Sequence, residues 1–189
     1  FIRYVIGANG AQVYDAWEKR ILHKAEMNRE EILRFFDASE SSTAITGCYK
    51  NGKAYMSRAD MEKMEAYSPG QALFRMMRRI YLPVEDLKTF LLESEETVQK
   101  LMLFFADLEE RRRVLAHMEA TLSDLSVSSS VINNIEVNTG EANKGAALKF
   151  LRGYLGIKKE ETAAFGDGSN DITMLMEAGI GFAMENACP

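Results

Sequence analysis

The stretch Gly166-Asp167-Gly168-Ser169-Asn170-Asp171 decides the fold class of this chain of 189 residues. An apolar run, 162–165, precedes it, and a helix-like run, 172–178, follows it. An apolar run, a glycine-rich turn and a helix-like run predict a strand, a tight turn and a helix. We therefore expect Asp167 at the carboxyl end of a buried strand and Asp171 at the start of the next helix.

The polar side chains of this turn are suited to a metal ion. In open α/β sheets, ligands bind in the crevice outside the carboxyl ends of the strands. Asp167, Asn170 and Asp171 would place two carboxylates and an amide there, and Mg²⁺ prefers oxygen ligands of this kind. A simpler interpretation also stands: Asp167 could be a turn residue and Asp171 an acid favoured by the helix dipole. Asn170 could likewise be a plain helix cap.

The segment from Asn143 to the end extends this α/β pattern. It reads helix, strand, helix, strand, at the spacing of a parallel βαβ unit. The predicted helix from Lys144 to Leu155 has apolar residues on one face, and Gly156 follows it as a C-terminal stop. Taken alone, Lys144 would be read as a surface lysine of this helix.

The composition is that of an acidic globular protein. Hydrophobic residues make up 47% of the chain and aromatic residues 10%, and the net charge is −5. A general nucleic-acid-binding protein would usually be basic, so we expect no nucleic-acid partner. No run approaches the roughly 18 apolar residues of a membrane span, and no signal peptide is visible. We therefore expect a cytoplasmic protein without a membrane partner. Its two cysteines, Cys48 and Cys188, show no metal-ligand spacing.

The middle of the chain alternates helices and strands, joined by hairpins as well as crossovers, and this indicates an α+β layer of its own. Asn28 and Glu31 have the spacing of a capping box, and Asp107 is a second candidate cap. The expected helices are 28–36, 84–92 and 108–122. The expected strands are 42–49, 54–57, 98–105, 125–130 and 134–137. Near the start, 2–6 reads as a buried strand and 12–14 as a short one.

The simplest architecture is an α/β fold whose parallel-sheet core comes from both ends of the chain, with an inserted α+β domain. We assign 1–15 and 141–189 to the core and 16–140 to the inserted domain. The chain begins inside a strand pattern without an initiator Met and stops soon after another strand-like run. We therefore expect the sequence to be truncated at both ends.

Several motifs together resemble a known family. They are Asn143-Lys144-Gly145 followed by a helix and Leu155-Gly156-Ile157, the run 165–175, the run 178–187, and Asn9-Gly10-Ala11. This set resembles the haloacid dehalogenase (HAD) superfamily of phosphohydrolases, in the Cof-type subgroup with a large α/β cap. The likeness is loose over the whole chain and close over 141–189.

The resemblance implies a magnesium-dependent phosphatase that works through an aspartyl-phosphate intermediate. Asp167 would be a direct ligand of Mg²⁺, and Asp171 would support the metal directly or through its other ligands. Lys144 would neutralise the transferring phosphoryl group and hold the nucleophile. Asn170 would contact a phosphate oxygen or orient the metal ligands. Phosphoryl transfer depends mainly on positioning and charge stabilisation, which a metal and a lysine supply.

Two further positions follow from the same resemblance. Asn9 and Gly10 match the turn just ahead of the cap, so they are possible neighbours of the substrate. Asn-Gly is also a strong turn dipeptide, so both could simply be turn formers.

One part of the family pattern has no counterpart. The family nucleophile lies in an Asp-x-Asp motif, and no two of the eight aspartates here are separated by one residue. The Ser or Thr of the second motif would also fall before Phe1, because Ser128, Ser129 and Ser130 belong to the cap by this resemblance. We therefore expect an N-terminally truncated chain that holds half an active site and is inactive alone. The parent would be a phosphatase of small phosphorylated metabolites. The alternative is an incomplete fragment that binds a ligand or dimerises through an exposed core.

Overall fold

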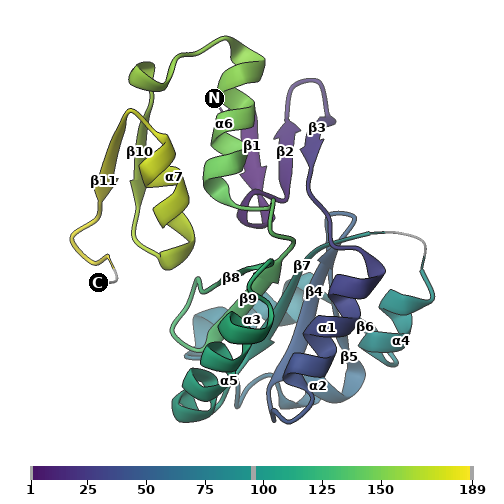
Figure 1. The fold of residues 1–189 in the computed structure, drawn as a ribbon. Coiled ribbons are helices and arrows are strands. Elements are labelled where there is room, and N and C mark those ends of the chain that lie inside the picture. The colour runs from purple at the N-terminus through teal and green to yellow at the C-terminus, as the bar shows by residue number, and fades with distance from the viewer. Residues whose placement is uncertain (1, 95–96, 188–189) are drawn as a thin grey trace.

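The computed structural model describes residues 2–94 and 97–187, so Phe1 and Cys188 lie outside the described part (Figure 1). We call residues 26–140 the cap, and residues 2–25 with 141–187 the core. The cap occupies the lower half of the view in Figure 1, and the core lies above it. No helix among the described residues is long and apolar enough to cross a membrane.

The cap is built on a six-stranded sheet with the order β6-β5-β4-β7-β9-β8. Its strands are β4 (Ile45–Lys50), β5 (Lys53–Ser57), β6 (Tyr81–Val84), β7 (Val98–Phe104), β8 (Ser126–Ser128) and β9 (Asn134–Asn138). Neighbouring strands are antiparallel except β5 and β6, which are parallel. All seven residues of β7 are buried, because this strand lies inside the sheet with β4 on one side and β9 on the other.

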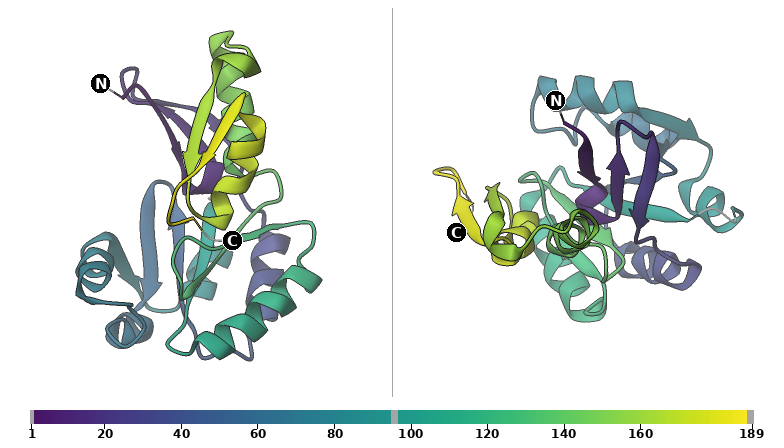
Figure 2. Two further views of the ribbon diagram at one scale, coloured as in Figure 1. Left: turned by 90° about the vertical axis from the view of Figure 1, so that its left-hand side faces the viewer. Right: turned by 90° about the horizontal axis from the view of Figure 1, so that it is seen from above.

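Helices cover both faces of this sheet (Figure 2). They are α1 (Arg29–Ser39), α2 (Arg58–Lys63), α3 (Gln71–Ile80), α4 (Leu87–Leu92) and α5 (Leu108–Thr121). Residues of α1, α4 and α5 pack with Leu101 and Leu103 in one apolar cluster, and residues of α2 and α3 pack with Met102 and Phe104 in another. Successive side chains of a strand point to opposite faces, so β7 supplies both layers of the cap interior.

Two of the predicted helix starts in the cap are confirmed, whereas the helix expected from residue 84 begins at Leu87, after β6 and the N-cap residue Asp86. The Asn28 side chain accepts a hydrogen bond from the Glu31 N–H, and the Glu31 carboxylate accepts one from the Asn28 N–H. This reciprocal pair is a capping box and satisfies two backbone donors at the start of α1. Asp107 caps α5 by accepting from the Glu109 N–H.

The core consists of two small sheets and two helices. β1 (Tyr4–Gly7), β2 (Gln12–Asp15) and β3 (Arg20–Lys24) form an antiparallel sheet, and β10 (Ala163–Gly166) pairs in parallel with β11 (Ile180–Ala183). The helices are α6 (Lys144–Leu155) and α7 (Ile172–Glu177), and Gly156 ends α6 in the left-handed conformation, as expected. Short 3₁₀ turns cover Ala8–Gly10, Lys159–Glu161 and Ser169–Asp171.

The structure corrects two burial predictions and adds elements that were not expected. The strand that precedes Asp167 is not buried throughout, because Phe165 of β10 is 62% exposed. The strand near the start is not buried: Val5 is 45% exposed, because β1 is an edge of its sheet and has no second neighbour among the described residues. β3 pairs with β2, so the expected boundary at residue 16 falls between two paired strands. α2, α3 and β6 were not predicted: α2 and α3 cover the second face of the cap sheet, and β6 is its edge strand.

Candidate functional site

An ion pair between Lys144 and Asp171 lies at the centre of the candidate site. Lys144 is the first residue of α6, and Asp171 ends the short turn before α7. The Lys144 Nζ donates to Asp171 Oδ1 at 2.5 Å. The second oxygen, Oδ2, accepts the N–H groups of Asp167 (3.0 Å) and Gly168 (3.1 Å). The structure thus brings together three of the predicted positions at the carboxyl end of β10.

These contacts hold the carboxyl group of Asp171 in its charged form. Burial alone would raise its pKa, since the residue is only 6% exposed. The hydrogen bond from Lys144, the two backbone N–H groups and the attraction to the ammonium together outweigh burial and lower the pKa of Asp171 below its ordinary value. Both oxygens are therefore already occupied by protein donors.

The close approach of α6 to α7 depends on Gly145. Its N–H donates to the Thr173 Oγ1 at 3.1 Å. A Cβ on Gly145 would lie 2.4 Å from the Thr173 carbonyl oxygen, so a larger residue cannot fit without movement of a helix. This contact sets the position of Lys144, the preceding residue, against the Asp171 turn.

Asp167 differs from Asp171 because its side chain faces solvent. The residue is exposed, and its Oδ2 accepts a hydrogen bond from Asn186 Nδ2 at 3.0 Å. No group of three or more His, Cys, Asp or Glu side chains suited to a metal ion exists among residues 2–94 and 97–187. Mg²⁺ commonly uses one or two protein carboxylates and completes its shell with water and substrate phosphate. The exposed carboxylate of Asp167 could hold an ion of that kind, while Asp171 holds Lys144 and the loop through its hydrogen bonds.

The other predicted positions, Asn170, Asn9 and Gly10, also lie together. The Asn170 Nδ2 donates to the Asn9 Oδ1 at 3.3 Å. Gly10 is buried, and a Cβ there would lie 2.2 Å from the Asn143 carbonyl oxygen at the start of α6. Asn170 is not the cap of α7, whose first turn has no side-chain cap.

Sequence reasoning missed a buried ion pair in the cap. Lys100 of β7 and Glu136 of β9 lie 2.8 Å apart, at 7% and 2% exposure. The Glu136 carboxylate also accepts from Asn9 Nδ2 at 2.7 Å and from Ser130 Oγ at 2.8 Å. Charged residues inside otherwise apolar strands were the available signal, because a buried charge is costly unless it is paired.

Glu136 is charged in spite of its burial. Burial by itself would raise the pKa of this carboxyl group, but the attraction to Lys100 lowers it. Hydrogen bonds from Lys100, Asn9 and Ser130 lower it further, and the net pKa lies below the ordinary value.

The serines 128–130 belong to the cap sheet and its following loop. Ser128 ends β8, and the Ser129 N–H donates to Ser169 Oγ at 3.3 Å. Ser169 begins the 3₁₀ turn that directly follows Asp167 and Gly168. This contact joins the cap to the core at a second point beside the Asn9 bridge.

A small cavity of about 180 Å³ opens between α3 and the cap sheet. Its polar lining includes Lys100, Glu136 and Tyr49, and its apolar lining includes Met76 and Met77. The Lys100 ammonium also lies 5.3 Å from the centre of the Tyr49 ring, within cation–π range. Because Glu136 contacts both this cavity and Asn9, the cavity is linked to the core site through hydrogen bonds.

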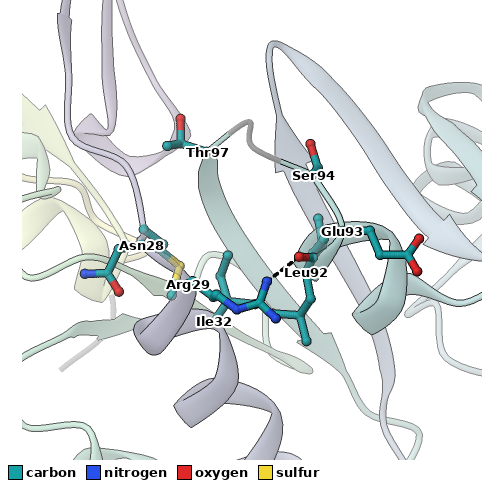
Figure 3. A pocket seen from close by; sticks show the side chains of 9 residues that line it. Asn28, Arg29, Ile32, Leu92, Glu93, Ser94 and Thr97 are labelled. Carbon is teal, nitrogen blue, oxygen red and sulfur yellow. Dashed lines mark hydrogen bonds between the residues drawn. The ribbon is translucent and has the colours of Figure 1, made fainter.

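A larger hollow of about 330 Å³ lies elsewhere in the cap, between α1 and α4 (Figure 3). Arg29 crosses it and donates to the Leu92 carbonyl oxygen. None of the predicted site residues lines this hollow. The Asn28 side chain at its rim is already used to cap α1.

Comparison with known proteins agrees with the fold and the motifs. A family model described as haloacid dehalogenase-like hydrolase matches residues 1–189. Phosphatase YwpJ of Bacillus subtilis is 29% identical over 200 residues, which cover 97% of this chain and 70% of that protein. The 5-amino-6-(5-phospho-D-ribitylamino)uracil phosphatase YcsE of Bacillus subtilis is 39% identical over 94 residues, which cover 48% of this chain and 37% of that protein.

A solved structure of a haloacid dehalogenase-like hydrolase from B. subtilis has a TM-score of 0.82 and 26% identity, covering 98% of this chain and 70% of that one. Two curated relatives that match nearly all of this chain are longer than it, since the chain spans 70% of one and 64% of the other. The resemblance seen in the motifs is confirmed. The chain therefore belongs to the haloacid dehalogenase-like hydrolase family.

Proposed function

We propose that this chain carries the cap and the phosphate-binding half of a magnesium-dependent phosphatase of small phosphorylated metabolites. The observation that carries the proposal is the Lys144–Asp171 pair beside the exposed carboxylate of Asp167 at the end of β10. A fixed ammonium next to an exposed carboxylate suits a phosphate that arrives with a divalent cation. The names of YwpJ and YcsE, both phosphatases, support the same activity.

Each residue of the site then has a distinct task. Lys144 holds a phosphate oxygen and balances its charge, and Asp171 keeps Lys144 in place. Asp167 would hold Mg²⁺, which when bound stabilises the negative charge of the phosphoryl oxygens. Asn170 orients the loop that carries Asp167. The attacking carboxylate, which forms the aspartyl-phosphate intermediate, comes from sequence outside these 189 residues, because no Asp-x-Asp occurs within them.

The cap would receive the organic part of the substrate. A lid that closes over a site excludes water and commits the substrate. The cavity of about 180 Å³ has charged and aromatic groups on one wall and methionines on another, which suits a small hydroxylated metabolite. The acidic net charge supports small-molecule partners, and we include a cytoplasmic location in the proposal.

Calorimetric titration of the chain with inorganic phosphate, with and without Mg²⁺, tests the phosphate site directly. We expect Mg²⁺ to raise the affinity of the wild type for phosphate. In Asp167→Asn, the affinity for phosphate should be the same with and without Mg²⁺. Lys144→Met should weaken phosphate binding by about 10- to 100-fold, the scale of one hydrogen bond to a charged group. Lys149→Met, which removes an exposed lysine from the same helix, serves as the control. Equal phosphate affinity in both lysine variants would contradict the assignment.

A second candidate function is self-association of an incomplete module, and one observation favours it. Phe165 of β10 is 62% exposed and stacks on Phe182 of β11, with ring centres 4.7 Å apart. Ile180, beside them, is 56% exposed. Among the described residues β10 pairs only with β11, so this apolar face has a free strand edge. Such an edge favours pairing with a second copy of the chain.

A further inference from the structure

The turn Ala8-Asn9-Gly10 lies where the core meets the cap. Its three residues have φ values of 49°, 61° and 98°, all in the left-handed region that L side chains rarely adopt. Gly10 packs so tightly against the start of α6 that a Cβ would lie 2.2 Å from the Asn143 carbonyl oxygen. The turn therefore packs directly against the backbone beside Lys144, so a change in its conformation would shift the start of α6 at the candidate site.

The Asn9 side chain reaches across this junction into the cap. Its Nδ2 donates to Glu136 Oε2 at 2.7 Å, and it makes longer contacts to Ser128 Oγ (3.3 Å) and Asn138 Oδ1 (3.4 Å). Asn138 is fully buried and in turn donates to the Ala8 carbonyl oxygen at 2.9 Å. The cap thus holds both the backbone and the side chain of the turn.

The charge of Glu136 sets the orientation of two successive amides. A carboxylate can only accept, so Asn9 must direct its NH₂ group at Glu136 and its oxygen away from it. That oxygen accepts from Asn170 Nδ2 at 3.3 Å, so Asn170 must direct its NH₂ group at Asn9. The Asn170 Oδ1 then lies over Gly168, where a Cβ would be only 2.7 Å from it.

Asn9 differs from another asparagine of this chain that only forms a turn. Asn51, in the β4–β5 hairpin, also has a left-handed backbone, with φ of 48°. Its side chain is exposed, as expected for a residue that only forms a turn. Asn9 is half-buried and bridges Glu136 and Asn170, which a turn former does not need to do.

We propose that Asn9 is a positioning residue that couples the seating of the cap to the orientation of Asn170. When the cap lies against the core, Glu136 fixes the Asn9 amide, and Asn9 fixes the Asn170 amide with its oxygen toward the Asp167 loop. When the cap leaves, Asn170 loses this constraint. Asn170 is thereby assigned to orienting the loop rather than to donating to phosphate. The inference rests on the proposed function only in treating Asn170 as a site residue.

The test uses the full 189-residue chain and two readouts that need neither phosphate nor Mg²⁺, so its outcome is independent of the phosphate titration. The first readout is the side-chain amide signal of Asn170 in a ¹H–¹⁵N NMR spectrum. The second is hydrogen exchange at the Ser129 amide, which donates to Ser169 across the junction. Asn9→Gly removes the side chain but keeps the left-handed backbone accessible. Asn51→Gly is the control, because it makes the same substitution at a left-handed turn position whose side chain does not connect the cap to the core.

We expect Asn9→Gly to shift the Asn170 signal and to speed exchange at Ser129 by about tenfold, the scale of one lost hydrogen bond to a charged group. Asn51→Gly should change neither readout. Asn9→Asp, which also tolerates the left-handed conformation, places a second carboxylate against Glu136 and should disturb both readouts. An unmoved Asn170 signal in Asn9→Gly would overturn the proposal, and so would a shifted signal with unchanged Ser129 exchange.

Discussion

At the scale of single residues, the site is organised by charges that are already paired. Asp171 and Glu136 are buried carboxylates, and each accepts from one lysine and from several further donors. Removing one member of such a pair leaves an uncompensated buried charge, which typically costs about 3–5 kcal/mol. The motifs singled out Lys144 and Asp171 as site residues, but the ion pair between them was not predicted and emerges from the structure. The second pair joins residues 36 positions apart on two strands, and no local pattern reports such a contact.

The Glu136 pair leads to a prediction about acid stability. The pKa of Glu136 is lower in the folded chain than its ordinary 4.5. Its contribution to the free energy of unfolding is therefore complete above about pH 4.5 and is lost as the pH falls through the folded value. Glu136→Gln should lower the free energy of unfolding at pH 7 by about 3–5 kcal/mol, because Lys100 keeps a buried charge without its partner.

Urea unfolding of the wild type and of Glu136→Gln between pH 7 and pH 3 measures this effect. The difference between the two should shrink as the pH falls below about 4.5. Glu62→Gln, at an exposed carboxylate, is the control and should unfold like the wild type throughout. A difference that does not depend on pH would show that Glu136 is not charged in the folded chain.

At the scale of helices and strands, glycines decide which elements approach closely. Gly145 and Gly153 are both in α6, but only Gly145 faces a neighbour, the Thr173 carbonyl oxygen of α7. No other atom of the described residues lies within 4 Å of a Cβ built on Gly153. Gly145→Ala should destabilise the chain by about 1–3 kcal/mol through overpacking. Gly153→Ala should stabilise it by about 0.5–1 kcal/mol, because alanine favours a helix interior.

Thermal unfolding of these two alanine variants gives the comparison, with the wild type as reference. The variants carry the same chemical change in the same helix, so helix propensity alone would raise the melting temperature of both. Opposite shifts are expected. If Gly145→Ala also raised the melting temperature, the close contact between α6 and α7 would not limit the position of Lys144.

The same scale shows how much of the fold could be predicted. Elements with an explicit local signal, such as α1 with its capping box, α5 with Asp107 and the buried strand β7, lie where they were expected. β6 gave no such signal, because it contains Pro83, has an exposed Leu82 and lies at the sheet edge. α3 was not predicted either, because its sequence mixes arginines with methionines. Its apolar face is recognised from its packing against the cap sheet in the structure.

At the scale of the whole molecule, the apolar interior is unevenly distributed. The cap contains two large clusters of buried side chains, one on each face of its sheet. Among the described residues of the core, three buried alanines, Ala11, Ala25 and Ala142, form a small cluster. The large apolar side chains of β10 and β11, Phe165, Ile180 and Phe182, are instead exposed to solvent. Exposed apolar area of this kind commonly marks an interaction surface.

This imbalance predicts that the chain associates with itself through the β10–β11 face. Burying Phe165 and Phe182 in a second copy would remove their rings from water, and each large apolar side chain contributes about 1.5–3 kcal/mol when fully buried. Sedimentation velocity at increasing protein concentration should therefore show a dimer that Phe165→Ser converts to a monomer. Ile132→Ser removes an equally exposed apolar side chain from the cap, 69% exposed, and should leave the dimer intact. A monomer at every concentration would argue against self-association, whereas a dimer lost in both variants would place the interface on the cap as well as on the core.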